Sequence, residues 1–355
     1  MKKRIGILLL TGLFMTGVCG ATAYAEGESE IPNVTESTDV DDVTVPFTKN
    51  LKIAEGVTVP DVTFTFEIEP QTEGAPAASM GAITYENIDT TGDLTAESTY
   101  VISKDSEITF APFTKAGVYE YEVNEKQGAM EGMSYDTDTY TLRVYVINSE
   151  NGGFEIEAIT AEKDGVKQSE IVFDNQYVEN RALCIRKNTV GSQADKSKDF
   201  TFKIQFLKSG TEDVAVAEYI GKIGAEEVIC SINTETEFQL HDGEELVFEA
   251  LPVGTRYLVT EVEEEDKYTP AIQVIENGTE VYTVTGVDGT DLSSSKDGTS
   301  STLVGEQENK VVFTNTYDDT PRTGLFLQRA PFVILVVAAI CAVAGLTVIN
   351  SKKRG

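Results

Sequence analysis

Val172-Phe-Asp-Asn-Gln-Tyr177 alternates apolar and polar residues, and the pattern returns as Val312-Phe-Thr-Asn-Thr-Tyr317 near the end of the 355-residue chain. Side chains of a β-strand point to opposite faces in turn, so this alternation predicts a strand with one buried face. Because the stretch occurs twice with the same spacing of apolar residues, the sequence predicts two domains built on one pattern.

Two further pairs of stretches support this repeat. Phe64–Ile68 (FTFEI) returns as Phe200–Ile204 (FTFKI), and Gly117–Glu125 (GVYEYEVNE) returns more loosely as Gly254–Glu261 (GTRYLVTE). Short alternating runs separated by turn residues are typical of antiparallel β-sandwiches. We therefore expect an all-β protein with two tandem β-sandwich domains, at residues 45–178 and 179–318.

The first 44 residues have a different character. Residues 1–25 start with Lys2, Lys3 and Arg4, continue with an apolar run and end in the small-x-small sequence Ala-Tyr-Ala, which predicts a secretory signal peptide cleaved after Ala25. Residues 26–44 are acidic with few apolar side chains, so we expect a flexible leader. The mature protein should therefore be exported.

The C-terminal end predicts a membrane anchor. Residues 332–349 form an uncharged apolar run just long enough to span a bilayer, and residues 352–354 are basic. Residues 319–324 lie just outside the span and include the sequence TPRTG, residues 320–324. This combination resembles the cell-wall sorting signal of Gram-positive surface proteins, with Thr320 in place of the usual Leu. The resemblance implies cleavage by a sortase between Thr323 and Gly324, which discards Gly324 together with the membrane segment and basic tail at residues 325–355.

Charge and composition exclude several functions. The chain has 28 basic and 59 acidic residues, a net charge of −31, and loss of both terminal segments takes it to −38. Nucleic-acid binding needs clustered Lys and Arg, so it is excluded. The single His and the lack of calcium-loop spacing argue against His chemistry and metal binding, and we expect neither cofactor nor metal.

Each predicted domain places one Lys, one Glu and one Asn in phase with apolar residues. The first set is Lys49, Glu125 and Asn175, and the second is Lys187, Glu261 and Asn315. The Lys-to-Glu spacings are 76 and 74 residues, and the Lys-to-Asn spacings are 126 and 128. One interpretation is that each side chain lies at a strand end and reaches solvent. The other is that all six point inward as two reactive clusters.

Buried clusters of this composition can form an amide bond. An apolar site lowers the pKa of Lys and raises that of Glu, so the amine becomes nucleophilic and the carboxyl protonated. Glu can then polarise the Asn carboxamide and move protons while the amine attacks, and ammonia leaves. The hypothesis is an internal Lys–Asn isopeptide bond in each domain, promoted by Glu125 and Glu261, which is self-modification rather than enzymatic turnover.

The chain resembles Gram-positive backbone pilins built from streptococcal pilin isopeptide-linkage domains. The resemblance is carried by 47–51, 119–125, 133–140 and 173–175 in the first domain, and by 185–187, 251–254, 259–261 and 313–315 in the second. It implies Ig-like sandwiches and bonds Lys49–Asn175 and Lys187–Asn315 that join the first and last strands of each domain.

The resemblance also implies polymerisation. In such pilins a sortase joins the sorting-motif Thr of one subunit to a Lys of the next, so Thr323 is the expected donor. The expected acceptor is an exposed Lys near the end of the first domain, with Lys167 as first choice and Lys163 as second. The implied partners are a sortase, identical subunits, minor pilins and peptidoglycan, on the bacterial surface.

Two other functions stay open at this point. The same domains could build a monomeric, wall-anchored adhesin that keeps the internal bonds but does not polymerise through Lys167. A weaker alternative is a secreted enzyme with Glu125 or Glu261 as general acid. The sequence also leaves open whether Cys184 and Cys230 form a disulfide or stay free thiols.

Overall fold

The computed structural model describes residues 3–4, 43–89, 92–150, 152–211, 216–262, 267–297 and 300–318. These residues form strands, turns and loops without a helix, which confirms the all-β prediction. Within these ranges there is accordingly no helix able to cross a membrane. The predicted signal cleavage at Ala25, nearly all of the leader, the sortase site at Thr323 and Gly324, and the predicted span within 325–355 lie outside the described residues.

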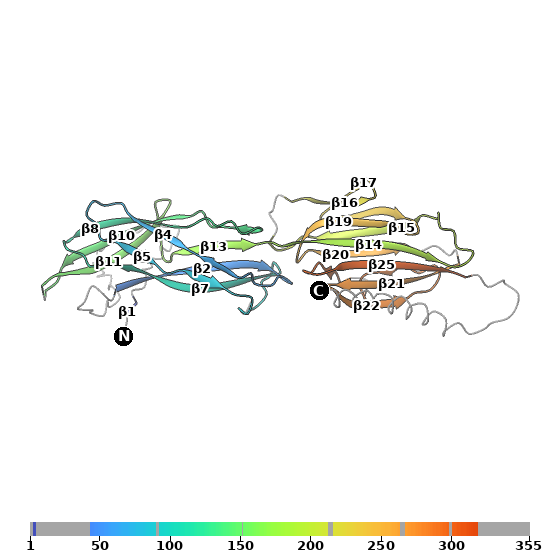
Figure 1. The fold of residues 1–355 in the computed structure, drawn as a ribbon, viewed down its shortest axis with the longest axis horizontal. Helices are drawn as coiled ribbons and strands as arrows, with labels where there is room; N and C mark the ends of the chain where they lie inside the picture. Colours follow the sequence, from blue (N-terminus) through green and yellow to red (C-terminus); the bar gives the residue numbers. More distant parts are fainter. Residues whose placement is uncertain are drawn as a thin grey trace, which may run out of the picture.

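The first half of the molecule is a sandwich of two sheets (Figure 1). One sheet has the order β5-β7-β2-β13-β9, with β1 pairing β2, and the other has the order β12-β11-β10-β8-β4; β3 and β6 form a separate pair. The strands are β1 (Lys3–Arg4), β2 (Val43–Ala54), β3 (Val62–Phe64), β4 (Phe66–Pro70), β5 (Ala78–Met80), β6 (Ile83–Tyr85), β7 (Thr99–Phe110), β8 (Gly117–Glu125), β9 (Met133–Ser134), β10 (Thr139–Asn148), β11 (Phe154–Lys163), β12 (Val166–Gln168) and β13 (Val172–Tyr177).

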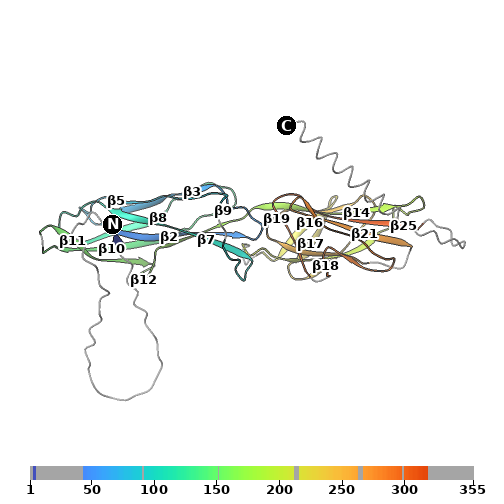
Figure 2. The same cartoon turned by 90° about the horizontal axis from the view of Figure 1, so that it is seen from below.

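The second half is also a two-sheet sandwich and follows the first end to end (Figures 1 and 2). Its sheets have the orders β17-β16-β19-β14-β25-β21-β22 and β18-β15-β20-β23, with β24 pairing β20. The strands are β14 (Asn180–Val190), β15 (Phe200–Leu207), β16 (Glu218–Ile223), β17 (Glu226–Ser231), β18 (Glu235–Leu240), β19 (Glu245–Pro252), β20 (Arg256–Val262), β21 (Tyr268–Glu276), β22 (Thr279–Thr285), β23 (Leu292–Ser293), β24 (Thr302–Leu303) and β25 (Asn309–Tyr317).

The first and last strands of each half lie side by side. Strand β2 pairs in parallel with β13, and β14 pairs in parallel with β25, whereas most other neighbours are antiparallel. Strand β2 begins at Val43, two residues before the predicted domain start, because Thr44 still pairs with Thr109 of β7. The parallel pairs bring together segments far apart in sequence, and they position the candidate site.

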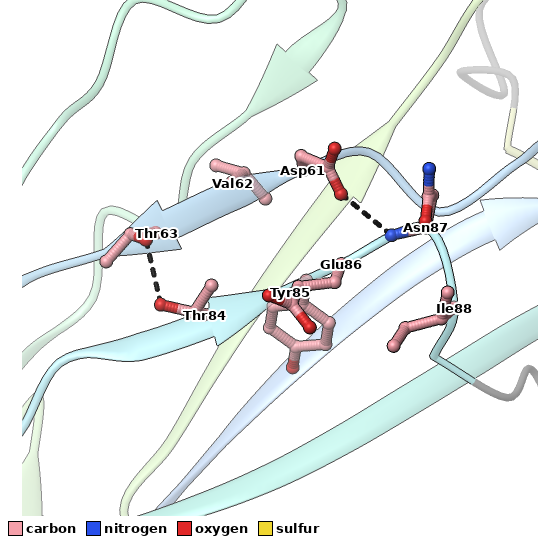
Figure 3. Close-up of a pocket in the computed structure, with 8 residues that line it drawn as sticks. All are labelled: Asp61, Val62, Thr63, Thr84, Tyr85, Glu86, Asn87 and Ile88. Atoms are coloured by element: carbon pink, nitrogen blue, oxygen red, sulfur yellow. Dashed lines mark hydrogen bonds between the residues drawn. The ribbon is translucent and has the colours of Figure 1, made fainter.

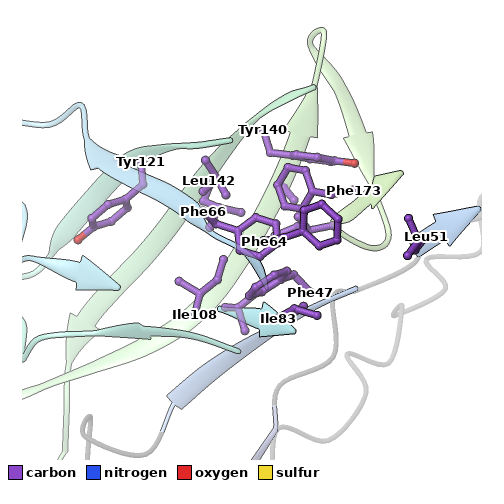
Figure 4. Close-up of a cluster of buried hydrophobic side chains, with 14 of the residues drawn as sticks. Phe47, Leu51, Phe64, Phe66, Ile83, Ile108, Tyr121, Tyr140, Leu142 and Phe173 are labelled. Carbon is purple, nitrogen blue, oxygen red and sulfur yellow. The ribbon is translucent and has the colours of Figure 1, made fainter. Parts of the chain in front are cut away.

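Each half has its own apolar core between its sheets. In the first half, Phe47 of β2 packs edge-on against Phe66 of β4 across the sandwich, with ring centres 4.7 Å apart (Figure 4). In the second half, Phe202 of β15 packs against Phe313 of β25 at 5.1 Å. The alternation of the strand sequences supplies these inward faces, since every second residue of β2, β15 and β25 is buried.

The two halves touch at a junction of polar and apolar contacts. Val253 of the second half packs into the core of the first, and Gly254 lies against Ala54. The Arg256 guanidinium binds the Glu55 carboxylate at 2.5 Å, and the Thr58 backbone N–H and hydroxyl both donate to the carboxylate of Glu306. The two sandwiches are therefore joined by these direct contacts as well as by the chain that connects them.

Candidate functional site: two buried Lys–Glu–Asn clusters

The parallel pairing of β2 with β13 places Lys49 and Asn175 on one face. Lys49 lies opposite Phe173, and Asn175 lies opposite Leu51, so the two polar residues are offset by two positions on neighbouring strands. Side chains two residues apart point to the same side of a sheet. Both therefore enter the core of the first half, as the alternation predicts.

Glu125 reaches this pair from the opposing sheet. It ends β8, and its Oε2 accepts a hydrogen bond from Lys49 Nζ at 2.7 Å while its Oε1 accepts one from Asn175 Nδ2 at 2.6 Å. Lys49 Nζ also donates to the Phe173 carbonyl at 3.2 Å and lies 4.9 Å from the centre of the Phe64 ring. The carboxyl group thus bridges the amine and the carboxamide with one oxygen each.

A backbone group completes the first cluster. The Asp136 N–H donates to Asn175 Oδ1 at 2.7 Å. The carboxamide of Asn175 is therefore held at both ends, because its oxygen faces Asp136 and its nitrogen faces Glu125. The alternation argument did not find Asp136, since a backbone donor in a loop has no side-chain periodicity.

Burial shifts both ionisable groups of this cluster toward their neutral forms. Lys49 has no exposed surface and Glu125 is only 4% exposed. Desolvation lowers the pKa of Lys49, opposed by its hydrogen bond to Glu125. Desolvation likewise raises the pKa of Glu125, opposed by the hydrogen bonds from Lys49 and Asn175. The pair titrates as a unit, and a neutral amine beside a protonated carboxyl is accessible to it.

The second half repeats the arrangement. Lys187 lies opposite Phe313 and Asn315 lies opposite Thr189 in the parallel pair of β14 and β25, which is the same two-residue offset. Glu261 comes from β20 in the other sheet. All three side chains are fully buried, so the predicted inward orientation of all six residues is confirmed.

The carboxyl group of the second cluster binds its two partners differently from that of the first cluster. Lys187 Nζ and Asn315 Nδ2 both donate to Glu261 Oε1, the latter at 3.0 Å. Lys187 Nζ lies 3.7 Å from the centre of the Phe200 ring and 5.7 Å from that of Phe202. Aromatic faces and one carboxyl oxygen therefore surround this amine.

Both clusters bring together a nucleophile, an acid–base group and an acyl group. The amine and the carboxamide share one carboxyl group, which lies within hydrogen-bond distance of both. An acid–base group in this position can take a proton from the amine and give one to a departing nitrogen. Acyl transfer from Asn to Lys is the reaction that this arrangement favours.

Comparison with known proteins places the chain in a family. The model of the Spy0128-like isopeptide containing domain matches residues 45–178, and that of a domain of unknown function, DUF7601, matches residues 181–317. A pilin of Streptococcus pyogenes serotype M1 is 30% identical over 352 residues, covering 94% of this chain and 95% of that protein. The chain belongs to the streptococcal pilin family.

Two other similar proteins cover less of this pilin-family chain. The crystal structure of the major pilin from Streptococcus pyogenes is 28% identical and covers 77% of this chain and 98% of that one, with a TM-score of 0.36. The pilus tip adhesin Cpa of Streptococcus pyogenes is 31% identical over 143 residues, which span 40% of this chain and 18% of the adhesin.

The two lysines considered as acceptors have different surroundings in this pilin-family chain. Lys167 is exposed at the middle of β12, the outermost strand of its sheet. Lys163 ends β11 and forms an ion pair with Asp138, which raises its pKa. Lys167 is therefore the more accessible amine of the two.

The remaining polar candidates do not form a second kind of site. Cys184 and Cys230 are both free thiols, and burial raises the pKa of each to about 11. His241 lies at a turn and its Nδ1 is 2.8 Å from the Glu244 carboxylate. Among the described ranges, no three His, Cys, Asp or Glu side chains gather as metal ligands would.

A shallow pocket of about 560 Å³ lies beside the β3–β6 pair (Figure 3). The Thr63 and Thr84 hydroxyls share a hydrogen bond of 2.8 Å at one side, and the Asn87 N–H donates to the Asp61 carboxylate at the other. Tyr85 links it to the first cluster, since its hydroxyl donates to the Lys49 carbonyl at 2.6 Å. Of the contacts named, the Tyr85 hydroxyl is the one that holds the backbone of Lys49.

Proposed function

We propose that this protein is a structural pilus subunit that cross-links itself internally and is joined to its neighbours by a sortase. The observation that carries the proposal is the pair of buried Lys–Glu–Asn clusters between parallel first and last strands. A buried Lys–Glu pair stabilises a fold poorly compared with apolar residues of the same size, so its occurrence in both halves supports a chemical role. Membership of the pilin family supports the same conclusion.

The internal reaction balances within each cluster. In the first half, a proton moves from Lys49 Nζ to Glu125, and the freed amine attacks Asn175 Cγ. A new C–N bond forms, the bond from Cγ to Nδ2 breaks, and ammonia leaves. Of the three ammonium protons of Lys49, one stays on the new amide, one leaves with the ammonia and one remains on Glu125. No oxidant, metal or cofactor takes part, and each cluster reacts once.

The external linkage follows from the predicted sorting signal. A sortase cleaves between Thr323 and Gly324 and transfers the Thr323 carboxyl group to an amine of the next subunit. We assign that amine to Lys167, because it is exposed on an edge strand, whereas Lys163 is engaged by Asp138. Signal cleavage after Ala25 and release of residues 324–355 leave a wall-linked, extracellular product of residues 26–323.

Mass spectrometry tests the internal bonds. The intact mass of residues 26–323 should fall short of the sequence mass by two ammonia molecules. Glu125→Ala and Glu261→Ala should each restore one of them, whereas Glu122→Ala, an exposed neighbour on β8, should restore none. An unshifted mass in the unsubstituted protein contradicts the proposal.

Electrophoresis of cell-wall extracts tests polymerisation. The unsubstituted strain should give a ladder that resists detergent and heat. Thr323→Ala and Lys167→Ala should each collapse it to monomer, whereas Lys163→Ala should leave it intact. A ladder that survives Lys167→Ala but not Lys163→Ala would move the linkage to the second lysine.

A monomeric, wall-anchored adhesin is the second candidate. The partial match to a pilus tip adhesin favours it, although that match spans 18% of the adhesin. It shares the internal bonds, so the mass measurement does not separate the two. Monomer alone in the wall extract of the unsubstituted strain would select the adhesin.

A further inference from the structure

The loop between β9 and β10 lies against the carboxamide of the first cluster. It belongs to the stretch 133–140, which carries part of the family resemblance but has no role in the reaction as described above. Its closest approach is the hydrogen bond of 2.7 Å from the Asp136 N–H to Asn175 Oδ1, and both groups are buried.

We propose that the Asp136 backbone N–H is a fourth catalytic group of the first half, which stabilises the negative charge that develops on Asn175 Oδ1 when Lys49 attacks. The inference rests on the proposed isopeptide bond. Attack on Cγ converts the carbonyl oxygen into an oxyanion, and a donor already aimed at that oxygen lowers the barrier. When the bond to Nδ2 breaks, an electron pair of the oxyanion re-forms the C=O bond, and the leaving nitrogen takes a proton and departs as ammonia. The Asp136 N–H donates to the oxygen throughout and gives up no proton.

The Asp136 side chain holds this N–H in place. Its Oδ2 accepts from the Asp174 N–H at 2.5 Å, and its Oδ1 accepts from the Asp138 N–H at 2.6 Å. The Asp136 carbonyl accepts from Gln127 Nε2 at 2.6 Å. Since Asp174 directly precedes Asn175, the carboxylate ties the loop to the strand that carries the reacting carboxamide. Asp136 thus contributes a catalytic backbone group and a positioning side chain.

The same contact fixes which way the carboxamide faces. With Oδ1 on the Asp136 N–H, Nδ2 points at Glu125 Oε1, which is the group that can protonate a leaving nitrogen. A flipped carboxamide would turn its leaving group away from Glu125 and place two N–H donors against each other. The loop therefore selects the reactive orientation as well as stabilising the charge.

The test follows the rate of bond formation in the full chain. Protein freshly made by cell-free synthesis is quenched at intervals in acid and denaturant, since protonation of Lys49 stops the reaction. Digestion and mass spectrometry then quantify the Lys49–Asn175 and Lys187–Asn315 cross-linked peptides separately. The second bond serves as an internal control in every sample.

Two changes to Asp136 separate its two roles. Asp136→Ala removes the hydrogen bonds to the Asp174 and Asp138 N–H groups but keeps the Asp136 N–H, so it should slow the first bond by less than about 10²-fold. Replacing Asp136 by its α-hydroxy acid exchanges the N–H for an oxygen but keeps the carboxylate, and should slow the first bond on the order of 10²-fold. The second bond should form at its usual rate in both. Thr137→Ala, an exposed change in the same loop, is the matched control.

The outcomes distinguish this inference from the proposed function. If the unsubstituted protein loses no ammonia from the first half, the proposed bond itself is wrong. If it does, and the α-hydroxy acid variant forms the first bond at the unsubstituted rate, only the role of Asp136 is overturned. If circular dichroism shows that Asp136→Ala does not fold, the α-hydroxy acid variant decides alone, because it retains the side-chain contacts.

Discussion

The two halves of the molecule carry the same cluster of Lys, Glu and Asn, but the hydrogen bonds within the cluster differ between the halves. Both place Lys and Asn on parallel neighbouring strands with the same two-residue offset. Glu125 binds its two partners through separate oxygens, whereas Glu261 binds both through Oε1. One half matches an isopeptide-containing family and the other a family of unknown function. The strand arrangement is thus a more constant feature than the local hydrogen bonding.

The two clusters also differ in where they lie relative to Lys167 and Thr323, the two linkage sites of the proposed function, and this difference has a mechanical consequence. Lys167 precedes Asn175, so tension between Lys167 and Thr323 passes along β13 directly into β14 and bypasses most of the first half. In the second half the tension enters through β14 and leaves through β25. A bond between Lys187 and Asn315 therefore carries load, whereas a bond between Lys49 and Asn175 mainly stabilises its own domain.

Single-molecule pulling between Lys167 and Thr323 should show the largest contrast. Asn315→Ala removes the second bond, so the force can unfold the second half. The chain between positions 187 and 315, a separation of 128 residues, should then add roughly 400 Å of length. Asn175→Ala should add no step of that size, because residues 49–166 lie outside the path. The unsubstituted protein is the control. A step of this length in Asn175→Ala, or none in Asn315→Ala, would break the comparison.

In thermal unfolding, loss of its internal bond should destabilise each half by a similar amount. The loops closed by the two bonds are nearly equal, 126 and 128 residues, so each bond should contribute about 5 kcal/mol. Glu125→Ala and Glu261→Ala should each lower the melting temperature of their own half by about 15 °C or more. Calorimetry with Glu122→Ala as control measures this. A fall confined to one variant would mean that only one half depends on its bond.

The pH dependence of stability should differ between the halves in Lys49→Met. Without the amine no bond forms, and Glu125 stays buried without the hydrogen bond and the charge of Lys49, which lowered its pKa; the hydrogen bond from Asn175 remains. Because the folded-state pKa lies above the unfolded value of 4.5, the folded state retains a proton that the unfolded state loses. Stability of the first half should therefore be greatest at acid pH and fall as the pH rises above 4.5.

Melting temperatures of the Lys49→Met variant, measured from acid pH to above pH 4.5, test whether the stability of its first half falls as the pH rises. The second half of the same variant should keep the pH dependence of the unsubstituted protein. Adding Glu125→Gln to Lys49→Met should remove the extra slope, because the amide does not titrate. A first half that gains stability with rising pH would show that Glu125 is ionised in the folded state throughout.

The smallest effect is expected at the junction between the halves. Gly254 has φ +91°, and a Cβ there would lie 2.6 Å from the Ala54 Cβ of the first half. Gly254→Ala should cost about 1–3 kcal/mol. Gly278→Ala is the control, because φ is +73° there but the nearest side chain is Gln307 of the same half. If both changes act equally on the melting of the first half, the packing of Gly254 on Ala54 contributes nothing.

Much of the site followed from the alternation of residues. Period two placed Lys49, Glu125 and Asn175 with their apolar neighbours, and the repeat made the same prediction for the second half. The prediction succeeded because strand geometry is local: a residue two positions from a buried Phe points to the same side. The roles assigned to these residues, and the choice of Lys167, stay predictions of the proposed function.

Other features were beyond the reach of that reasoning. The Asp136 N–H is a backbone group in a loop, and its position depends on where β9 and β10 are held. The contacts of Gly254 with Ala54 and of Arg256 with Glu55 join residues about 200 positions apart, and no spacing in the chain indicates them. Such contacts are set by the packing of whole sheets rather than by neighbouring residues.

The sequence by itself determined an all-β chain, a two-fold repeat and six polar residues on apolar faces, because each of these depends on the order of nearby side chains. Only the tertiary structure decided that the first and last strands of each half pair in parallel and in which register. That pairing closes loops of more than a hundred residues and is chosen by the packing of two sheets around a core. It is also what brings each amine within reach of its carboxamide.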